Sequence, residues 1–417
     1  MMPSNAAVVS VRTHYLVLGA LGISHFFNDA FQSLIPAALP LLKEGLFLSF
    51  TQVGLIATVF QITSSIFQPI VGWYTDRSPL PYSLPMGMTS TLLGILLLSC
   101  AWSFPVVLIA VALIGFGSAV FHPEASRLVY MASGGRWGFA QSFFQTGGNV
   151  GATLGTLLAA YLITPYGRQH IAWFSIFVFC AILWMIPLSR WYRRRLKERE
   201  SYENAAKQEP SGIVTGTLSK YTVSVTVSLL LLLVFSKALF TTCFSNFLTF
   251  FMIEKYQVSV QQSQLFLFAF LFATAAGTMI GGPVGDRIGR KWVIWVSILG
   301  PAPFALWLPH VDSLWGTCLL SMVIGASMAS SFPAILIFAQ ELMPGKVGAV
   351  GGLFFGFSFG SGAIAAALLG GLADFGGIMF VFELCSYIPL IGLLTWFLPN
   401  IPRSTSDYGL THQLKKP

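Results

Sequence analysis

The stretch GWYTDR at residues 72–77 returns as GPVGDR at residues 282–287, and the two lie 210 positions apart in a chain of 417 residues. Both copies begin with glycine, end with the pair Asp-Arg, and directly follow an apolar run. The same offset aligns Gly115 with Gly325. Landmarks at a constant offset indicate a duplicated chain, in which two halves share one fold and one orientation.

The composition excludes a water-soluble domain. Hydrophobic residues make up 55% of the chain and charged residues only 9%, whereas a soluble domain carries about 25% charged residues. Apolar runs recur that are long enough to cross a bilayer core of about 30 Å as helices, and they do not alternate as barrel strands would. We therefore predict an all-α membrane protein with twelve transmembrane helices in two pseudo-symmetric six-helix halves. The predicted spans are residues 14–41, 51–75, 82–101, 104–131, 137–163, 170–190, 221–253, 261–285, 290–309, 313–341, 346–372 and 377–398.

The predicted domain organisation follows the charged break between the halves. An N-terminal six-helix half covers residues 1–190, a basic cytoplasmic linker covers 191–220, and a C-terminal six-helix half with a short tail covers 221–417. Substrate sites in duplicated carriers lie between the halves near the middle of the membrane. We expect a functional monomer, because each chain supplies both halves.

Lysine and arginine are distributed unequally between the two sides of the predicted membrane. Of the 23 in the chain, eighteen fall on one side, three on the other and two within spans. The positive-inside rule puts the richer side, with both termini and the linker, in the cytoplasm. The net charge of +8 therefore sets topology, and we predict no nucleic-acid partner.

The five cysteines all fall inside predicted spans, and none forms a Cys-x-x-Cys pair. This pattern predicts neither a disulfide framework nor a metal site. The chain also lacks a nucleotide or catalytic motif in a suitable context. We therefore predict no cofactor and no enzymatic activity.

The stretch SHFFNDAFQ at residues 24–32 puts polar side chains inside the first predicted span. His25, Asp29 and Gln32 are spaced to form one stripe of a helix. A charge near the bilayer centre costs at least ~2.5 kcal/mol, so the stripe should face a wet interior, where a partly desolvated carboxylate takes up a proton more readily. We interpret Asp29 as a proton-coupling residue, and His25 and Gln32 as substrate-binding residues. The alternative is a buried hydrogen-bonded pair that only holds this span to a neighbour.

A second polar cluster, FHPEASR at residues 121–127, lies inside the fourth predicted span. Glu124 and Arg127 are three residues apart and can pair on a helix. We interpret Glu124 as a second proton-coupling residue, and His122 and Arg127 as groups that bind an anionic substrate. The alternative is a mutually neutralising structural pair, because burial alone would also select paired charges.

Lys237 lies well inside the seventh predicted span and has no carboxylate within a helical turn. The 210-residue offset maps it to position 27, so it should lie at nearly the depth of Asp29, across the symmetry axis. We interpret Lys237 as a substrate-binding cation or as a charge partner that Asp29 releases on protonation. The alternative is a side chain that snorkels to the membrane interface.

Charged residues in and near the repeated motif are interpreted as gating or structural groups, because aspartates can cap helix N-termini and pair with arginines. Glu341, near the end of the tenth span, is expected to bond loop bases such as Arg287 or Lys346, and the alternative is a proton site. The small-residue spacing that includes Gly151 and Gly155 would let the fifth span approach a partner helix closely. The full gating and structural set is Asp76, Arg77, Asp286, Arg287, Arg290, Glu341, Gly151 and Gly155.

The stretch GPVGDRIGRK at residues 282–291 resembles the cytoplasmic loop signature of the major facilitator superfamily, and the copy at residues 72–81 is truncated. More narrowly, SHFFNDAFQ and FHPEASR, together with FQPIVGWYTDR at residues 67–77, resemble bacterial fosmidomycin resistance proteins. One departure is Thr156, where drug/proton antiporters of the superfamily often carry proline. The departure weakens the antiporter signature but leaves the close packing of the fifth span.

The resemblance implies a proton-driven antiporter of the bacterial inner membrane that exports fosmidomycin, a small anionic phosphonate. Its partners would be the drug, protons and the lipid bilayer, and a proton arriving on Asp29 would weaken drug binding. The runner-up is a proton-coupled symporter or facilitator that imports a small organic anion, because the same residues would serve it. A membrane-bound sensor or enzyme has little support, because no loop is long enough to hold a second domain.

Overall fold

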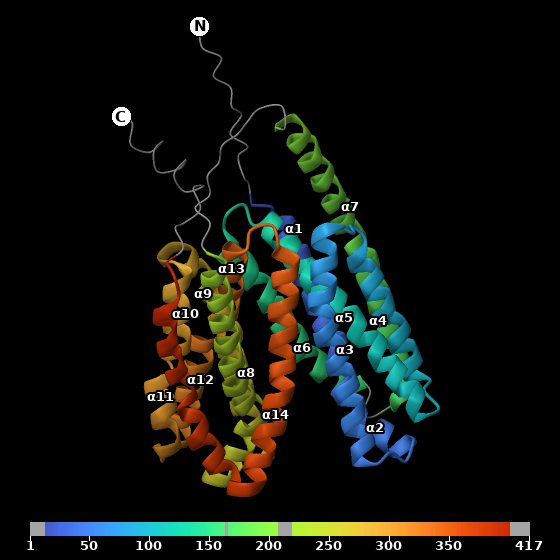
Figure 1. The fold of residues 1–417 in the computed structure, drawn as a ribbon. Helices are drawn as coiled ribbons and strands as arrows, with labels where there is room; N and C mark the ends of the chain where they lie inside the picture. Colours follow the sequence, from blue (N-terminus) through green and yellow to red (C-terminus); the bar gives the residue numbers. More distant parts are fainter. Residues whose placement is uncertain (1–12, 163–165, 207–218, 401–417) are drawn as a thin grey trace.

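The computed structural model describes residues 13–162, 166–206 and 219–400, and in these ranges the regular structure is helical, without strands. Residues 15–206 form one bundle and residues 220–397 form a second bundle beside it (Figure 1). The elements of the first bundle are α1 (Tyr15–Gln32), α2 (Leu34–Gly45), α3 (Phe50–Arg77), α4 (Ser83–Ser99), α5 (Phe104–Ala132), α6 (Trp137–Leu162), η1 (Arg168–Trp173) and α7 (Phe174–Ala206).

The second bundle has the same general plan and ends in a long bent helix. The elements of the second bundle are α8 (Lys220–Tyr256), α9 (Val260–Ile288), α10 (Arg290–Leu299), α11 (Ala302–Trp307), η2 (Leu308–His310), α12 (Leu314–Ala329), α13 (Ser331–Leu342), α14 (Val347–Ser386) and η3 (Ile388–Phe397). Inside α14, Gly377 has φ 81° and ψ 171°. This left-handed backbone breaks the helix at a residue type that accepts it without strain.

The described residues contain twelve membrane crossings. Eight helical stretches are long and apolar enough to cross a membrane. One of these, residues 347–397, supplies two crossings because the chain bends at Gly377. The other crossings are α4, α6 and the pair α1 with α2. The predicted twelve-helix membrane fold is therefore confirmed.

Helix caps repeat with the offset found in the sequence. Ser49 and Gln52 form a capping box at the start of α3, and Ser259 and Gln262 form the same box at the start of α9. A capping box satisfies two free N–H groups of the first helical turn through side chains. The duplication thus extends to the local signals that start corresponding helices.

Two helices differ from the predicted spans. The first span is divided at Ser33 into α1 and α2. The sixth span continues as α7 to Ala206, well past its predicted end at residue 190. The added turns carry residues with good helix propensity, and Arg195 pairs with Glu198 at 2.8 Å. Part of the predicted linker is therefore helical.

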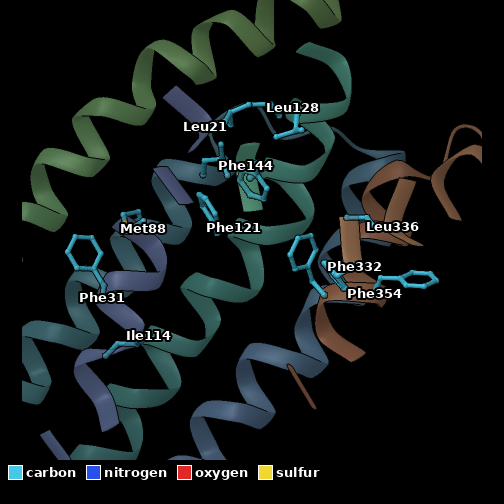
Figure 2. Close-up of a cluster of buried hydrophobic side chains, with 14 of the residues drawn as sticks. Leu21, Phe31, Met88, Ile114, Phe121, Leu128, Phe144, Phe332, Leu336 and Phe354 are labelled. Atoms are coloured by element: carbon cyan, nitrogen blue, oxygen red, sulfur yellow. The ribbon is translucent and has the colours of Figure 1, made fainter. Parts of the chain in front are cut away.

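The hydrophobic core is continuous across the two bundles. Phe121 and Phe144 of the first bundle belong to the same buried cluster as Phe332 and Phe354 of the second, and Figure 2 shows them together. Helix α3 packs along α14, and α6 packs along α9. These two helix pairs form the principal contacts between the bundles.

Glycines let the bundles touch through their backbones. A Cβ added to Gly72 of α3 would lie 2.0 Å from the carbonyl oxygen of Gly348 in α14. A Cβ added to Gly282 of α9 would lie 2.1 Å from the carbonyl oxygen of Gly138 in α6. Gly72 and Gly282 are the first residues of the two motif copies. The repeated glycine therefore permits the closest approach between the two halves.

Helix α6 packs against α1 by the same means. A Cβ on Gly151 would lie 2.1 Å from the carbonyl oxygen of Phe26, and one on Gly155 would lie 2.6 Å from that of Ala30. Both glycines therefore face the backbone of the helix that carries SHFFNDAFQ. This contact brings α6 next to the polar residues of α1.

Candidate functional site

Asp29 of α1 lies between two histidines. Its Oδ2 is 3.2 Å from Nε2 of His25, one turn earlier, and its Oδ1 is 3.7 Å from Nε2 of His122 in α5. The histidine side chains are 1% and 0% exposed, whereas that of Asp29 is 16% exposed. Oδ1 also accepts hydrogen bonds from Asn28 at 2.9 Å and Gln32 at 3.1 Å. We call His25, Asp29 and His122 the His-Asp-His cluster.

Backbone contacts determine which ring nitrogens face the carboxylate. Nδ1 of His25 lies 2.8 Å from the carbonyl oxygen of Phe144, and Nδ1 of His122 lies 3.0 Å from that of Ser118. A carbonyl oxygen only accepts, so we assign the ring proton to Nδ1 in both histidines. With neutral rings and an ionised Asp29, both Nε2 lone pairs would face a carboxylate. One added proton on Nε2 of either histidine would turn that contact into a hydrogen bond, which makes the cluster a candidate proton site.

The donor atoms of the His-Asp-His cluster lie within 4.8 Å of one another, which is close enough to hold a metal ion. The cluster supplies one negative charge, from Asp29. A buried site favours a bound charge that its own charge balances. A single proton balances this charge, and the cluster is therefore a candidate proton site.

Gly148 of α6 closes the cluster on a third side. A Cβ at this position would lie 2.5 Å from His25 Nε2 and 2.6 Å from Asp29 Oδ2. Sequence reasoning named Gly151 and Gly155 and missed Gly148. The sequence did contain a signal for Gly148. It falls outside the four-residue spacing of Gly147, Gly151 and Gly155, so the packing of α6 against α1 does not by itself require a glycine there.

A cavity of about 110 Å³ lies beside Lys237 of α8, between the two bundles. Gln145 and Asn149 of α6 line it from the first bundle, and Thr278 of α9 lines it from the second. Lys237 Nζ lies 5.4 Å from the centre of the Phe332 ring. No carboxylate is among the described lining residues. An ammonium inside the membrane-spanning bundle, beside amide and hydroxyl groups, is chemically suited to a small anion.

Sequence reasoning identified Lys237 but missed the two amides of α6. Gln145 and Asn149 are four residues apart inside an apolar span, so the spacing that revealed the stripe on α1 was present here too. The other residues predicted to bind substrate lie elsewhere in the structure: His25, Gln32 and His122 surround Asp29, and Arg127 belongs to an ion cluster.

Asp76, the aspartate of the first motif copy, caps a helix of the other bundle. Its Oδ1 accepts from the backbone N–H of Gly348 at 2.9 Å, and its Oδ2 accepts from that of Ala349 at 2.7 Å. These are free N–H groups in the first turn of α14, where the helix dipole favours negative charge. Arg127 Nη2 pairs with the same carboxylate at 2.7 Å. We call Asp76, Arg127 and the start of α14 the first latch.

Glu124 holds the arginine of the first latch. Its Oε1 lies 2.5 Å from Arg127 Nη1, and its Oε2 accepts from Ser83 at 3.0 Å. Arg127 also donates to the hydroxyl of Tyr192 at 3.2 Å. Glu124 is fully buried, and its ion pair with Arg127 offsets part of the hydration that both charges lose. The arrangement orients Arg127 toward Asp76.

Asp286, from the second motif copy, repeats this geometry. Its two oxygens accept from the backbone N–H groups of Gly138 at 2.8 Å and Phe139 at 2.9 Å, at the start of α6. Arg290 Nη1 lies 2.8 Å from Asp286 Oδ1, and its Nε lies 3.5 Å from Glu341 Oε1. We call Asp286, Arg290, Glu341 and the start of α6 the second latch. Each latch joins the end of one helix to the start of a helix in the opposite bundle.

The remaining basic residues of the gating set lie close to the latches. Arg77 ends α3 and stacks on the ring of Trp73, with 3.8 Å between the guanidinium carbon and the ring centre. Arg287 lies in the last turn of α9. Sequence reasoning proposed Arg287 or Lys346 as partners of Glu341, and the structure gives it Arg290.

These features together define a class of membrane protein. A duplicated helical bundle with a polar site between its halves, and charged contacts joining the halves at one end, is the architecture of a carrier whose halves rock about a central site. The chain belongs to the Major Facilitator Superfamily, whose family model matches residues 21–254 and 230–415. It is a multi-pass membrane transporter.

The chain is also similar to individual proteins of known sequence or structure. The chain is 50% identical over 395 residues to the fosmidomycin resistance protein of Escherichia coli K12, covering 95% of each chain. It is 40% identical over 388 residues to the uncharacterized transporter YfnC of Bacillus subtilis, covering 93% of this chain and 94% of that one. Among solved structures, FucP of the same superfamily in its outward conformation gives a TM-score of 0.69 at 14% identity, covering 94% of this chain and 100% of that one.

Proposed function

We propose that this transporter is a proton-coupled antiporter of the bacterial inner membrane that exports small anionic drugs of the fosmidomycin type. The observation that carries the proposal is the pairing of two separate polar sites. The His-Asp-His cluster in the first bundle is built to bind a proton, and Lys237 in the second bundle lines a cavity between the bundles without a carboxylate among the described lining. The 50% identity to a fosmidomycin resistance protein supports the export of a phosphonate.

The two latches support the proposal that the structure represents a carrier closed at one end of its bundles. Contacts between α3 and α14 run from Gly72 with Gly348 to Gln61 Nε2, which donates to the carbonyl of Phe359 at 2.5 Å. Eleven residues of α14 separate the ends of this contact, or roughly 16 Å at 1.5 Å per residue. The latches lie on the side that carries most of the lysine and arginine, which the positive-inside rule assigns to the cytoplasm together with both termini. We assign the structure to the outward-facing state.

The proposed cycle has two loaded states. With the cytoplasmic latches open, the phosphonate of the drug binds at Lys237, with Gln145 and Asn149 as hydrogen-bonding partners. Rocking of the halves closes the latches and exposes the drug to the opposite side. A proton then binds the His-Asp-His cluster, the drug leaves, and the protonated carrier returns and releases the proton on the cytoplasmic side. Glu124 and Arg127 act in this cycle through the first latch, which reassigns Glu124 from proton coupling and Arg127 from substrate binding.

The decisive experiment is fosmidomycin transport in proteoliposomes under an imposed pH gradient. We expect the wild type to move drug against the direction of proton flow. We expect Asp29→Asn to retain drug–drug exchange but to lose the response to the gradient, because a neutral amide removes the negative charge that holds the proton at the cluster. Lys237→Gln should lose both activities, because it removes the cation at the anion site.

Two results would overturn the proposal in different ways. Drug movement in the same direction as protons would establish symport of a small organic anion, which is the alternative that the same residues would serve. Full coupling in Asp29→Asn would remove the His-Asp-His cluster from the proton pathway.

We also propose that one chain forms the functional carrier. Purified protein that runs as a monomer and keeps its transport rate per chain would support this.

A further inference from the structure

Antiport of an anion poses an electrostatic problem at these sites. A proton on the His-Asp-His cluster adds positive charge to the interior of the membrane protein. By charge alone it would strengthen the binding of an anion at Lys237, and this is the behaviour of a symporter. The proposed antiport therefore requires a contact through which the bound proton weakens anion binding at Lys237, against the direct effect of its charge.

A chain of ring contacts joins the two sites across the bundle interface. The His122 ring lies 4.9 Å from the ring of Phe355 in α14. Phe355 in turn lies 5.0 Å from the ring of Phe332 in α13, at an interplanar angle of 69°. Phe332 is the ring over which Lys237 Nζ lies at 5.4 Å. The first contact crosses from one bundle to the other, and the next two lie within the second bundle.

We propose that Phe355 is the positioning residue through which a proton on the His-Asp-His cluster weakens anion binding at Lys237. This inference rests on the proposed function. A protonated His122 attracts the faces of neighbouring aromatic rings more strongly than a neutral His122 does. Phe355 is then held against His122 and withdraws from Phe332. The Phe332 ring, whose centre lies 5.4 Å from Lys237 Nζ, is then free to move closer and compete with the anion for the ammonium.

Burial makes the ring contacts responsive to a single charge. His122 is fully buried, and its Nε2 has no hydrogen-bond partner among the described residues. Phe355 and Phe332 are 2% and 3% exposed, so water does not screen the contact. Close-packed rings of this kind shift between discrete arrangements rather than deform. Figure 2 shows Phe332 and Phe354 in the core shared by the bundles.

Few charged groups can contribute to the expected pH response. Within the described residues, His25 of α1 and His122 of α5 face Asp29. Helix α6 presents Gly148 to the cluster, and α14 presents phenylalanine rings to His122. Lys237 is the only titratable side chain among the described residues that line its cavity. The pH response of anion binding therefore reports on the cluster and on Lys237 itself.

The test measures the Kd of fosmidomycin in nanodiscs at pH 6 and at pH 8 for four proteins. These are the wild type, Phe355→Leu, Phe355→Tyr and, as a matched control, Phe354→Leu, which changes the adjacent and likewise buried phenylalanine. We expect binding by the wild type to be about tenfold weaker at pH 6, within the range of typical coupling between sites. Phe355→Leu should abolish or reverse this ratio, because only the direct effect of charge remains. Phe355→Tyr and Phe354→Leu should keep it.

Drug–drug exchange at equal pH on both sides shows that each variant folds and binds drug. A wild-type ratio in Phe355→Leu, with exchange intact, would overturn the ring contact as the route of coupling. Equal loss of the ratio in Phe354→Leu would also overturn it, because general core damage would then explain the effect. A wild type whose Kd does not weaken at low pH would instead refute the antiport mechanism, and the ring contact with it.

Discussion

At the scale of single residues, the His-Asp-His cluster depends on atoms that no one segment supplies. Asp29 and His25 come from α1, His122 comes from α5, and the missing side chain of Gly148 comes from α6. Two backbone carbonyls orient the histidines, so that their free nitrogens meet at one carboxylate. Preorganised groups of this kind need little rearrangement when the proton arrives.

Gly148→Ala tests this packing directly. The added Cβ would fall 2.5 Å from His25 Nε2 and 2.6 Å from Asp29 Oδ2, so α6 or the cluster must shift. We expect proton-coupled transport to fall at least about tenfold, because ångström-scale misplacement of a reacting group has effects of this size or larger. Transport driven by a pH gradient in proteoliposomes measures the loss.

The matched control for this change is Gly19→Ala. Gly19 lies on α1, the helix of Asp29, and a Cβ there would meet no atom within 4 Å. The two variants thus make the same chemical change, but only one of them disturbs the cluster. Near wild-type coupling in Gly148→Ala would show that the close approach of α6 does not matter for the proton site.

At the scale of helices, each copy of the repeated motif supplies a latch that joins the two halves. The aspartate of each motif copy lies at the end of a helix and binds two N–H groups at the start of a helix in the opposite bundle. An arginine inside the same bundle as the aspartate, Arg127 or Arg290, holds each carboxylate in place. Each latch can therefore form only when the bundles close at this end.

We predict that Asp76→Asn and Asp286→Asn each open the latch end. Asparagine keeps one acceptor oxygen but loses the second backbone bond and the ion pair with arginine. The loss of a helix cap costs about 1 kcal/mol, and a bond to a charged group contributes about 1.5–3 kcal/mol. We therefore expect each change to shift the equilibrium at least about tenfold toward the state that is open at this end.

Spin labels at Ser78→Cys and Lys346→Cys would measure this shift, because both positions are exposed and lie next to the two sides of the first latch. The population with a long distance between labels should increase in each variant. The double variant should increase it further, because the latches use different helices and their effects should add. An unchanged distance distribution in both single variants would mean that the latches do not control closure.

At the scale of the whole molecule, the sequence predicted what depends on pattern alone. Hydropathy marked the spans, and the 210-residue offset between GxxxDR copies revealed the duplication, because both signals are carried by the order of residues. The pairing of Glu124 with Arg127 was among the alternatives, since helical spacing suffices to suggest it. The sequence showed equally well that Lys237 has no carboxylate within a turn of its own helix.

Contacts between distant helices were harder to predict, because they depend on the rotation of each helix about its axis. Spacing along α5 does not indicate that His122 faces Asp29 or that Arg127 faces Asp76. Both residues were therefore assigned to substrate from their chemistry alone. Phe355 was one of 37 phenylalanines, and nothing in the sequence distinguished it.

The change of the whole molecule between its two open states should depend on Gly72 and Gly282, the first residues of the two motif copies. A Cβ on Gly72 would lie 2.0 Å from a carbonyl oxygen of α14, and one on Gly282 would lie 2.1 Å from a carbonyl oxygen of α6. Such distances require the backbones to separate, so Gly72→Ala and Gly282→Ala should prevent closure at the latch end. We expect both variants to bind fosmidomycin from that side and to transport it at less than about a tenth of the wild-type rate, because a strong bias between two states removes the second state from the cycle.

Gly54→Ala provides the comparison within α3, because a Cβ at Gly54 would meet no atom within 4 Å. It should transport like the wild type and give the same distances between the labels at positions 78 and 346. In Gly72→Ala the same labels should report almost entirely the open latch end. Wild-type transport by Gly72→Ala would contradict the argument, since the halves would then close without the backbone contact that the repeated motif provides.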